Sequence, residues 1–417
     1  MEIFYTLVIK AYSLIVRLAG PFSSKAAEWT QGRKDLLSYI ESRMNDEGKS
    51  IWFHCASLGE FEQGRPVMES FRQKNPGIRL VVTFFSPSGY NVRKNWGGAD
   101  HVYYLPADTP ANARRFIEAV NPVAAVFVKY DFWYNYLSVL NSKKIPVILI
   151  SGIFRRRQHF FRWYGGFFRK MLSFFSHLFV QDSFSEELLV KAGIRNVTVS
   201  GDTRFDRVAE IAASAVEIPV LKYFAGNSRV MVCGSTWPAD EEIIARYRRE
   251  NSGRMKYIIA PHEVEQGNID RITTLFGRGT IRYSSVVEKA DSDADVMIID
   301  TIGILSSAYR YATIALIGGG FGRGIHNILE AAAWSKPVIF GPNYGKFREA
   351  CELIELKGAF SFSGFEQFAR IVDKWVTDDA SRGDAASICG KYVAENQGSA
   401  GIITAYLSSI CESPVKG

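Results

Sequence analysis

The residues best suited to binding a phosphate group are concentrated between Ile317 and Phe347. An apolar segment over 313–317 is followed by closely spaced glycines, which predicts a strand, a glycine turn, a helix beginning near His326 and a second strand over 337–340. Unpaired N–H groups at a helix start attract phosphate, and glycines let a ligand approach the backbone closely. A carboxylate one helical turn later, at Glu330, suits ribose hydroxyls. The candidate ligand-binding residues of this stretch are Gly319, Gly320, Arg323 and His326 for phosphate, and Glu330 for ribose.

Neither of two common phosphate-binding motifs fits this stretch. The dinucleotide fingerprint requires glycine three places after Gly320, where the chain has Arg323, and the P-loop requires lysine after Gly324, where it has Ile325. Glycines that follow a strand also form tight turns that bind nothing. The stretch is therefore either a phosphate site or a tight turn that binds no ligand.

Two carboxylates follow predicted strands in the first half of the chain. Glu60 comes after a buried strand over 51–56 and a short turn, and Asp131 follows a strand over 124–128 amid aromatic residues. Ligands of open α/β sheets bind at the carboxyl ends of strands, so the two side chains are candidates for acid–base chemistry. The alternatives are a helix-dipole partner for Glu60 and a helix cap for Asp131.

Two further loops in the second half could contact a nucleotide. Ser235 and Thr236 end a strand that begins at 230, and such a loop can cradle phosphate or a base. His262 follows a strand over 256–260, where it could contact a leaving phosphate, although a lone loop histidine is more often structural.

Composition predicts two folded domains and a reducing compartment. The 417 residues exceed what one core usually supports, and five scattered cysteines show neither a disulfide framework nor a zinc motif. Metal sites and cofactors are therefore not expected. The net charge of +7 is uneven, because residues 1–208 carry +10 and residues 209–417 carry −3. This asymmetry predicts an acidic partner for the first half, meaning an anionic membrane, a phosphorylated substrate or nucleic acid.

The first twenty residues predict an amphipathic helix at a membrane interface. Lys10 and Arg17 interrupt the apolar run, which is then too short for an uncharged spanning helix of about 18 residues. Thr6, Lys10, Ser13 and Arg17 form a polar stripe at helical spacing, with apolar residues elsewhere around the helix. A helix packed on its own domain is the alternative. The predicted membrane-interface segment covers residues 1–30.

Basic and aromatic residues alternate over 153–179 in the most unusual composition of the chain. Such a segment can bind an anionic lipid surface through interfacial rings, or single-stranded nucleic acid by stacking. We prefer the lipid interpretation because of the N-terminal helix, and expect no nucleic-acid partner. A solvated helix with core aromatics is the structural alternative. The predicted acceptor and membrane contacts are Lys10, Arg17, Arg155, Arg156, Arg157, Arg162 and Trp163.

Strands alternate with helical patterns through both halves, which predicts doubly wound parallel sheets in an α/β fold. The expected domains are residues 31–208 and 209–417, joined near 205–225, with the last helix possibly packing back on the first domain. The expected strands cover 51–56, 80–85, 101–105, 124–128, 146–150, 177–181, one near 196–206, 230–233, 256–260, 296–299, 313–317 and 337–340.

Segments spread over nearly the whole chain carry a family resemblance. They are WFHCASLGEFEQ, KYDFWYN, GDTRFDRV, GSTWPADEE, APHE and IGGGFGRGIHNILEAA followed by PVIFGP. In this order they resemble the 3-deoxy-D-manno-octulosonic acid (Kdo) transferases of lipopolysaccharide synthesis. The resemblance implies a GT-B fold, in which two Rossmann-like domains face a cleft. It also implies inverting transfer of Kdo from CMP-Kdo to a lipid A precursor at the cytoplasmic face of the bacterial inner membrane, without a catalytic metal.

The resemblance also assigns roles to individual residues. Glu60 matches the catalytic base, Asp131 stands where glutamate is usual, and Asn327 and Glu330 match the nucleotide-binding motif. Three positions depart from the pattern: Ile325 replaces a second glycine, Ile328 replaces a proline, and Pro261-His262 lacks an accompanying arginine. The alternative functions are another GT-B enzyme using a different nucleotide sugar and a non-catalytic membrane- or nucleic-acid-binding protein.

Overall fold

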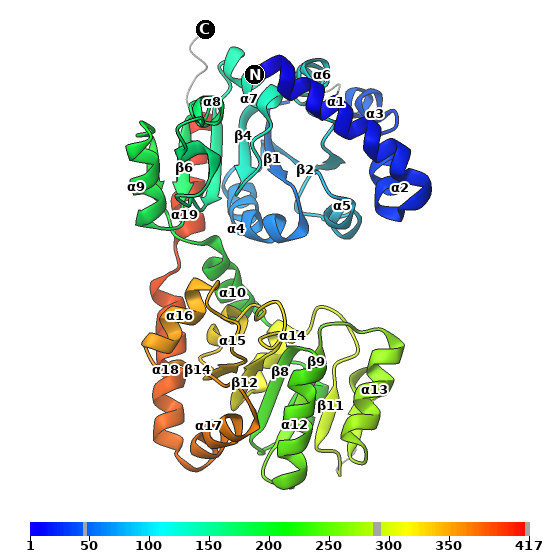
Figure 1. The fold of residues 1–417 in the computed structure, drawn as a ribbon, viewed down its shortest axis with the longest axis vertical. Coiled ribbons are helices and arrows are strands. Elements are labelled where there is room, and N and C mark those ends of the chain that lie inside the picture. Colours follow the sequence, from blue (N-terminus) through cyan, green and yellow to red (C-terminus); the bar gives the residue numbers. More distant parts are fainter. Residues whose placement is uncertain (45–47, 287–292, 413–417) are drawn as a thin grey trace. The chain divides into compact units, whose positions relative to one another are not determined.

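The computed structural model describes residues 1–44, 48–286 and 293–412. The chain forms two compact units (Figure 1), one containing Met1–Arg207 and Gln397–Gly417, the other Val208–Asn396. The change of unit between Arg207 and Val208 lies one residue from the boundary that the sequence predicts. Each unit is built on one parallel seven-stranded sheet, in agreement with the expected fold class.

The sheet of the first unit has the strand order β3-β2-β1-β4-β5-β6-β7. Its strands are short runs of β-branched and aromatic residues, and β1 is buried along its whole length, as strands covered by helices on both faces must be. The strands are β1 (Ser50–Cys55), β2 (Arg79–Phe84), β3 (His101–Tyr104), β4 (Pro122–Val128), β5 (Val147–Gly152), β6 (His177–Val180) and β7 (Val197–Val199).

Helices connect these strands and cover the sheet (Figure 1). They are α1 (Glu2–Ala19), η1 (Gly20–Phe22), α2 (Ser24–Gln31), α3 (Leu36–Arg43), α4 (Leu58–Lys74), α5 (Pro87–Arg93), α6 (Pro110–Val120), α7 (Tyr134–Ser142), η2 (His159–Phe161), α8 (Gly166–Leu172), α9 (Ser183–Lys191) and, from the end of the chain, α19 (Ser399–Glu412).

The second unit repeats the architecture with the strand order β10-β11-β9-β8-β12-β13-β14. Two of its strands, β10 and β14, escape prediction because each has three residues and is only partly buried, so neither shows an apolar run. The strands are β8 (Val230–Thr236), β9 (Lys256–Pro261), β10 (Thr280–Arg282), β11 (Val296–Ile298), β12 (Ile314–Ile317), β13 (Val338–Phe340) and β14 (Ala359–Ser361).

The helices associated with this second sheet include several of one or two turns. They are α10 (Thr203–Ser214), which crosses the change of unit, α11 (Pro219–Ala225), α12 (Pro238–Glu250), α13 (Gln266–Phe276), η3 (Tyr283–Ser285), α14 (Leu305–Ala308), η4 (Tyr309–Tyr311), α15 (Leu329–Ala332), α16 (Arg348–Glu355), α17 (Phe365–Thr377) and α18 (Asp379–Glu395).

In both sheets the direction of the strand order changes at a central pair, β1–β4 in the first and β8–β12 in the second. Loops that leave the carboxyl ends of such a pair diverge to opposite sides and form a crevice where ligands bind. Glu60 and Asp131 follow β1 and β4, while the segment from Trp237 and the glycine turn from Gly318 follow β8 and β12. These four segments therefore lie at the two crevice positions, while the candidate His262 follows β9 (Lys256–Pro261).

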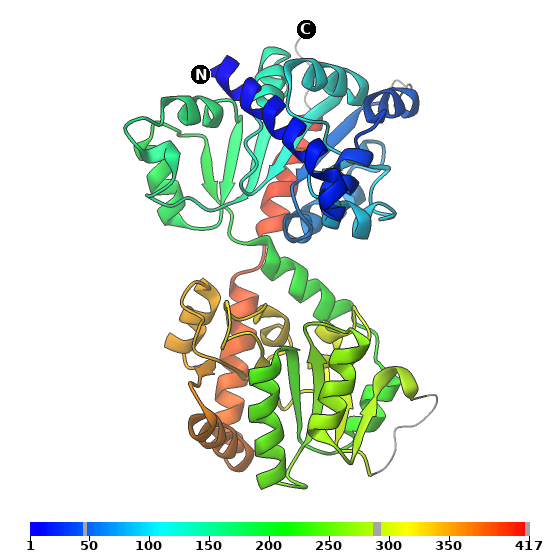
Figure 2. The same cartoon turned by 45° about the vertical axis from the view of Figure 1, so that its right-hand side comes forward.

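Helix α1 lies along the first unit, as Figure 2 shows in dark blue, with its apolar side outward. The inner side is tied down by a hydrogen bond of 2.7 Å from Tyr5 Oη to Asp108 Oδ2 and by edge-on packing of Tyr5 against Tyr134. Of the predicted polar stripe, Thr6 and Ser13 are half-buried. Lys10 and Arg17 are exposed, and so are the apolar residues Ile3, Phe4, Leu7, Val8, Leu14, Ile15 and Leu18.

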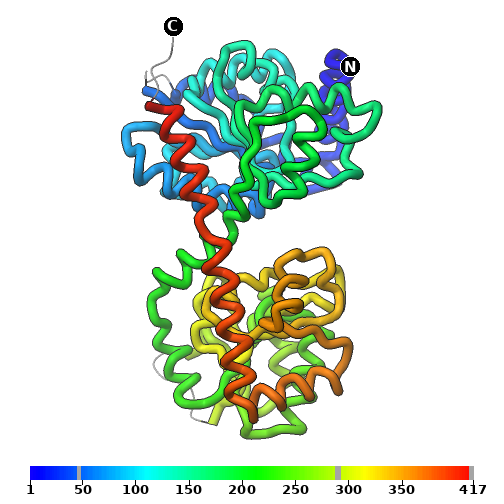
Figure 3. Tube along the Cα trace, turned by 90° about the vertical axis from the view of Figure 1, so that its left-hand side faces the viewer, coloured from blue at the N-terminus to red at the C-terminus, as the bar shows by residue number. Residues whose placement is uncertain are grey.

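The last helix, α19, belongs to the first unit and appears in red beside it in Figure 3. It packs on α4, and the side chains of Ala400, Ile403 and Leu407 join the apolar cluster formed by one face of the first sheet. The first unit thus depends on residues from both ends of the chain.

We expect Ile403→Ala to destabilise the first unit by about 2–5 kcal/mol, because it leaves a cavity at a fully buried position. The neighbouring Ile402 is 48% exposed, and Ile402→Ala should change stability by no more than about 0.5 kcal/mol. Amide hydrogen exchange measured on β1 and β4 compares the two variants. Equal protection in both would contradict the assigned packing of α19.

Candidate functional site

Glu60 occupies the first turn of α4, directly after β1. Its Oε2 accepts the backbone N–H of Ser57 at 3.0 Å, which closes a capping box. Burial raises the pKa of Glu60 above its ordinary value, and the negative charge of Asp131 raises it further. The helix-terminus role weighed from the sequence is therefore present, and the same carboxylate has the raised pKa that suits a general base.

Asp131 faces a buried histidine that the sequence analysis did not single out. His54 is fully buried on β1, its Nε2 lies 2.8 Å from Asp131 Oδ2, and its Nδ1 lies 2.8 Å from Thr83 Oγ1. Trp133 Nε1 also donates to His54 Nε2, at 3.0 Å. Because His54 Nε2 cannot both accept from Trp133 and donate to Asp131, it can form only one of these two hydrogen bonds at a time.

Asp131 does not cap α7, the helix that follows it. The backbone N–H groups of Asn135 and Tyr136 instead donate to the two carboxylate oxygens of Asp108, at 3.1 and 3.0 Å. Burial raises the pKa of Asp108 to about 6. The cap alternative for Asp131 is therefore wrong, and its carboxylate is left to Glu60, His54 and the adjoining pocket.

That pocket has a volume of about 460 Å³ and a mostly apolar wall. Helix α1 contributes Tyr5 and Ile9 to it, so the outward-facing helix also borders the Asp131 loop. The remaining lining residues are Tyr130, Asp131, Phe132, Trp133, Gln158, His159, Phe160, Phe168 and Met171.

The basic and aromatic segment divides between core and surface. Phe154 and Phe160 are buried, as the structural alternative predicts for the aromatic rings. Arg155, Arg156, Arg157 and Arg162 are exposed, and Trp163 is 92% exposed. Arg169 Nη1 donates to the carbonyl oxygens of Phe160 and Arg162, at 3.0 and 2.9 Å, and so fixes the loop that presents Trp163.

In the second unit, the helix after the glycine turn begins later than predicted and is short. It covers only Leu329–Ala332, because His326 N–H bonds back to Gly318 O and the side chains of Ile325 and Ile328 are buried. The side chain of Asn327 accepts the Leu329 N–H at 3.1 Å. The prediction of a helix start at His326 is wrong, and N–H groups of the turn itself become the anion-binding candidates.

Glu330, which was assigned to the ribose, is held inside the second unit. Its Oε1 accepts from Asn327 Nδ2 at 3.1 Å and its Oε2 accepts from Ser306 Oγ at 2.6 Å. These contacts fix Asn327 and Glu330 relative to each other. A ribose hydroxyl would have to use the lone pairs that these two hydrogen bonds leave.

Asp240 holds the glycine turn against the start of α12. Its Oδ2 accepts the N–H groups of Gly319, at 2.9 Å, and Trp237, at 3.0 Å. Burial raises the pKa of Asp240 to about 6. Gly319 has a φ of 89°, a left-handed conformation that favours glycine, so the turn depends on residue type as well as on Asp240.

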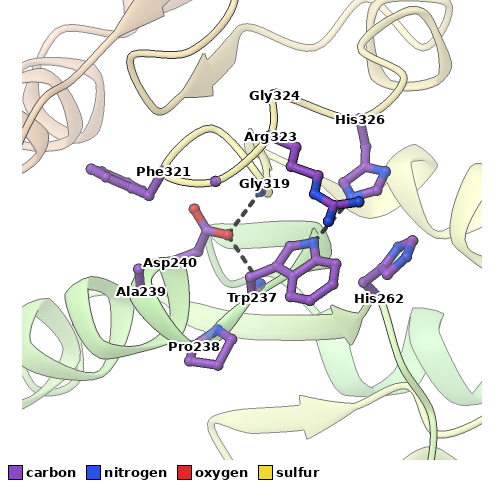
Figure 4. A pocket seen from close by; sticks show the side chains of 11 residues that line it. Trp237, Pro238, Ala239, Asp240, His262, Gly319, Phe321, Arg323, Gly324 and His326 are labelled. Carbon is purple, nitrogen blue, oxygen red and sulfur yellow. Dashed lines mark hydrogen bonds between the residues drawn. The ribbon is translucent and has the colours of Figure 1, made fainter.

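Three aromatic rings beside the glycine turn are in mutual contact. Trp237 stacks on His262 with centroids 4.8 Å apart, and His262 stacks on His326 at 4.4 Å. Trp237 Nε1 donates to His326 Nε2 at 3.1 Å, the contact drawn in Figure 4. Burial lowers the pKa of His326, and the neighbouring His262 lowers it further. Because Nε2 accepts the Trp237 N–H, the neutral form of this ring has its proton on Nδ1.

These groups surround a pocket of about 800 Å³ (Figure 4). Of the residues predicted to bind a donor, His262, Gly319, Arg323 and His326 line it. Ser235, Thr236, Gly320, Asn327 and Glu330 are not part of its lining. The other lining residues are Trp237, Pro238, Ala239, Asp240, Phe321, Gly322 and Gly324.

Two of the remaining predicted residues have structural contacts instead. Thr236 is buried and its hydroxyl donates to Glu241 Oε1 at 2.9 Å, while Gly320 packs on Gly341 so closely that a Cβ would meet the backbone at 2.6 Å. Among the lining residues that sequence reasoning missed is Trp237, which directly follows the predicted Gly-Ser-Thr loop. Among the described residues no group of three or more His, Cys, Asp or Glu could hold a metal ion.

Comparisons with known proteins identify relatives of this chain by sequence. Residues 31–207 match the family described as 3-deoxy-D-manno-octulosonic-acid transferase. The chain is 28% identical to the transferase of that name from Aquifex aeolicus, over 78% of this chain and 84% of that one. It is 24% identical to the Haemophilus influenzae transferase over 95% of both chains. By this similarity the chain is a glycosyltransferase, like the Kdo transferases that it matches.

Solved structures extend the likeness to the fold. A UDP-GlcNAc 2-epimerase from Neisseria meningitidis bound to UDP-GlcNAc superposes with a TM-score of 0.62, covering 87% of this chain and all of that chain, at 16% identity. A putative UDP-N-acetylglucosamine 2-epimerase from Listeria monocytogenes gives 0.57 at 13% identity, covering 88% and 97% of the two chains. These likenesses show the GT-B class of fold and nothing of the substrate.

We expect Asp131→Asn to lower the pKa of Glu60, because it removes the negative charge that raises this pKa while burial remains. The Glu60 carboxyl should then ionise at lower pH, which an NMR titration of glutamate carboxyl carbons would follow. Asp35→Asn, at an exposed position before α3, is the control and should leave the Glu60 titration unchanged. An unchanged or raised pKa in Asp131→Asn would remove Asp131 as its cause.

Proposed function

We propose that this protein moves Kdo from CMP-Kdo to a hydroxyl group of a lipid A precursor, with inversion at the anomeric carbon. Similarity to the Kdo transferases supports the choice of sugar, and the pocket beside Asp131 supports the choice of acceptor class. Helix α1 forms part of that pocket with Tyr5 and Ile9 while its opposite face exposes apolar side chains. A pocket bordered by such a helix suits an acceptor that lies in a membrane.

Glu60 is the proposed general base. An acceptor hydroxyl is a weak nucleophile, so a carboxylate must take its proton as the oxygen attacks the anomeric carbon. Burial and the charge of Asp131 both raise the pKa of Glu60, which makes its ionised carboxylate a better proton acceptor. The base form is lost as pH falls through this raised pKa. A single displacement of this kind inverts the anomeric centre.

The donor is proposed to bind in the second unit, in the pocket of about 800 Å³. Negative charge develops on the phosphate oxygen as CMP leaves, and N–H groups of the glycine turn together with Arg323 can stabilise it without rearrangement. In its neutral form His326 can donate one further hydrogen bond from Nδ1, because its Nε2 accepts from Trp237. The Trp237 and His262 rings offer flat surfaces to a base, which compensates for the arginine missing beside His262.

The membrane role is proposed for α1 together with the exposed part of the basic and aromatic segment. Residues 2–22 are also long and apolar enough to cross a membrane by length and composition, with a mean hydropathy of 1.5. Because α1 is bonded to the first unit through Tyr5, we propose that it lies in the interface with its apolar face in the lipid. The exposed Arg155, Arg156 and Arg157 can add contacts to anionic headgroups, on the cytoplasmic face of the inner membrane.

Glu60→Gln tests the catalytic proposal with little risk to folding, because glutamine also completes a capping box. We expect turnover of CMP-Kdo with a lipid A precursor to fall on the order of a hundredfold or more, with CMP affinity unchanged. Mass detection of the product and calorimetry with CMP measure the two effects. Ser57→Ala, which weakens the cap but keeps the carboxylate, should retain most activity. Near-wild-type turnover in Glu60→Gln would remove Glu60 from its role, and tighter binding of UDP than CMP would favour another nucleotide sugar.

The membrane proposal is tested by placing charge on the outer face of α1. We expect Leu7→Glu with Leu14→Glu to abolish most sedimentation with vesicles that contain anionic lipid, because both side chains are exposed and apolar. Val216→Glu with Ile302→Glu, at exposed apolar positions of the second unit, is the matched control and should bind normally. Unchanged sedimentation of the α1 variant would contradict the proposal, and retention after an alkaline carbonate wash would indicate a spanning helix instead.

A further inference from the structure

The transferred sugar brings a second anionic group close to the phosphate of its donor. In an ulosonic acid the carboxylate is bonded to the anomeric carbon, and in a nucleotide-linked donor this same carbon bears the phosphate. Two negative charges are therefore held a few bonds apart. A donor site for such a sugar must satisfy both, and one cation shared between them would leave part of the charge uncompensated on desolvation. The inference below rests on the donor proposed above.

A second pocket adjoins the donor pocket and shares the tip of the glycine turn with it. Its volume is about 470 Å³, and its chemistry is that of an anion site. The residues that line it are Gly322, Arg323, Pro342, Asn343, Gly345 and Lys346, none of them acidic. Gly322 and Arg323 line both pockets, so a ligand that reaches past the turn tip enters the second one.

The walls of this second pocket are fixed to each other. The backbone N–H of Asn343 donates to Gly320 O at 2.9 Å, and its side-chain Nδ2 donates to Gly322 O at 2.9 Å. The close packing of Gly320 on Gly341 holds the same two segments together. These hydrogen bonds also engage two carbonyl oxygens of the turn, so their negative ends face Asn343 rather than a bound anion.

The two cations at this place are available to a ligand. Arg323 and Lys346 are exposed, and neither forms an ion pair within the described part of the chain. Figure 4 shows Arg323 extending from the turn toward the part of the donor pocket that holds Trp237 and His326. Lys346 does not line the donor pocket and is the second cation of the adjoining one.

We propose that the adjoining pocket binds the carboxylate of the transferred sugar acid through Lys346, while Arg323 serves the donor phosphate. The two charges of the donor then meet two different cations placed on one rigid turn. A neutral sugar on the same nucleotide would leave Lys346 without a partner. The pocket thereby selects sugar acids over neutral sugars.

The test compares binding of CMP-Kdo with binding of its carboxamide analogue, in the absence of acceptor, so that no transfer is required. Wild-type protein should bind the carboxylate form roughly fivefold to tenfold more tightly, and Lys346→Gln should lose this preference while its affinity for CMP is unchanged. Lys346→Arg should restore part of the preference. Lys374→Gln, which removes an exposed charge elsewhere in the second unit, is the control and should keep it.

The outcomes separate this subsite from the function on which it rests. If wild-type protein binds neither form, the proposed donor is wrong and the subsite falls with it. If wild-type protein distinguishes the two forms and Lys346→Gln does so equally, the donor stands and the subsite is wrong. An equal loss of CMP affinity in Lys346→Gln would place Lys346 at the nucleotide phosphate, and this result also overturns the proposal.

Discussion

Burial of both sheets on both faces is the constraint on which the rest of the structure depends. A strand such as β1, buried at all six positions, cannot carry an ionised side chain without a partner, because desolvation would cost more than burial gains. The one histidine of β1, His54, is surrounded by hydrogen-bonding groups. Charged groups are therefore placed in the loops at the strand ends, and the change of direction at β1–β4 and β8–β12 provides the room for them.

The same local hydrogen-bonding pattern holds one carboxylate in each unit. Glu60 and Asp240 each lie in the first turn of the helix after the first central strand, and each accepts the backbone N–H of the residue three places earlier, at 3.0 Å. A carboxylate held in this way is ordered before any ligand arrives, so little conformational entropy is lost when it acts. The two carboxylates then differ: Asp240 Oδ2 also accepts the Gly319 N–H of the glycine turn, while the charge of Asp131 acts on Glu60.

Features that depend on residues close together in the chain could be predicted from the sequence, whereas features that depend on distant contacts could not. The alternation of apolar runs with helical patterns was enough for the two parallel sheets and for the positions of Glu60 and Asp131, since both depend on chain order. The late start of α15 was not predictable, because it depends on burial of Ile325 and Ile328. The partners of His54 and Trp237 are distant in sequence, so only the fold brings them together. The direction faced by α1 was ambiguous for the same reason, since amphipathicity does not say which side is packed.

The outward orientation of the apolar face of α1 connects this face with the Asp131 loop of the first unit. A soluble helix would place its apolar face on the protein, yet α1 turns Tyr5 and Thr6 inward and leaves Leu7 and Leu14 exposed. Tyr5 Oη donates to Asp108 and accepts the backbone N–H of Tyr134 at 3.3 Å, and Asp108 in turn caps α7. The Asp131 loop thus ends on a helix whose start is fixed by α1. Any force on the exposed face of α1 therefore acts on this loop through two hydrogen bonds, so α1 and the pocket beside Asp131 behave as one structural element.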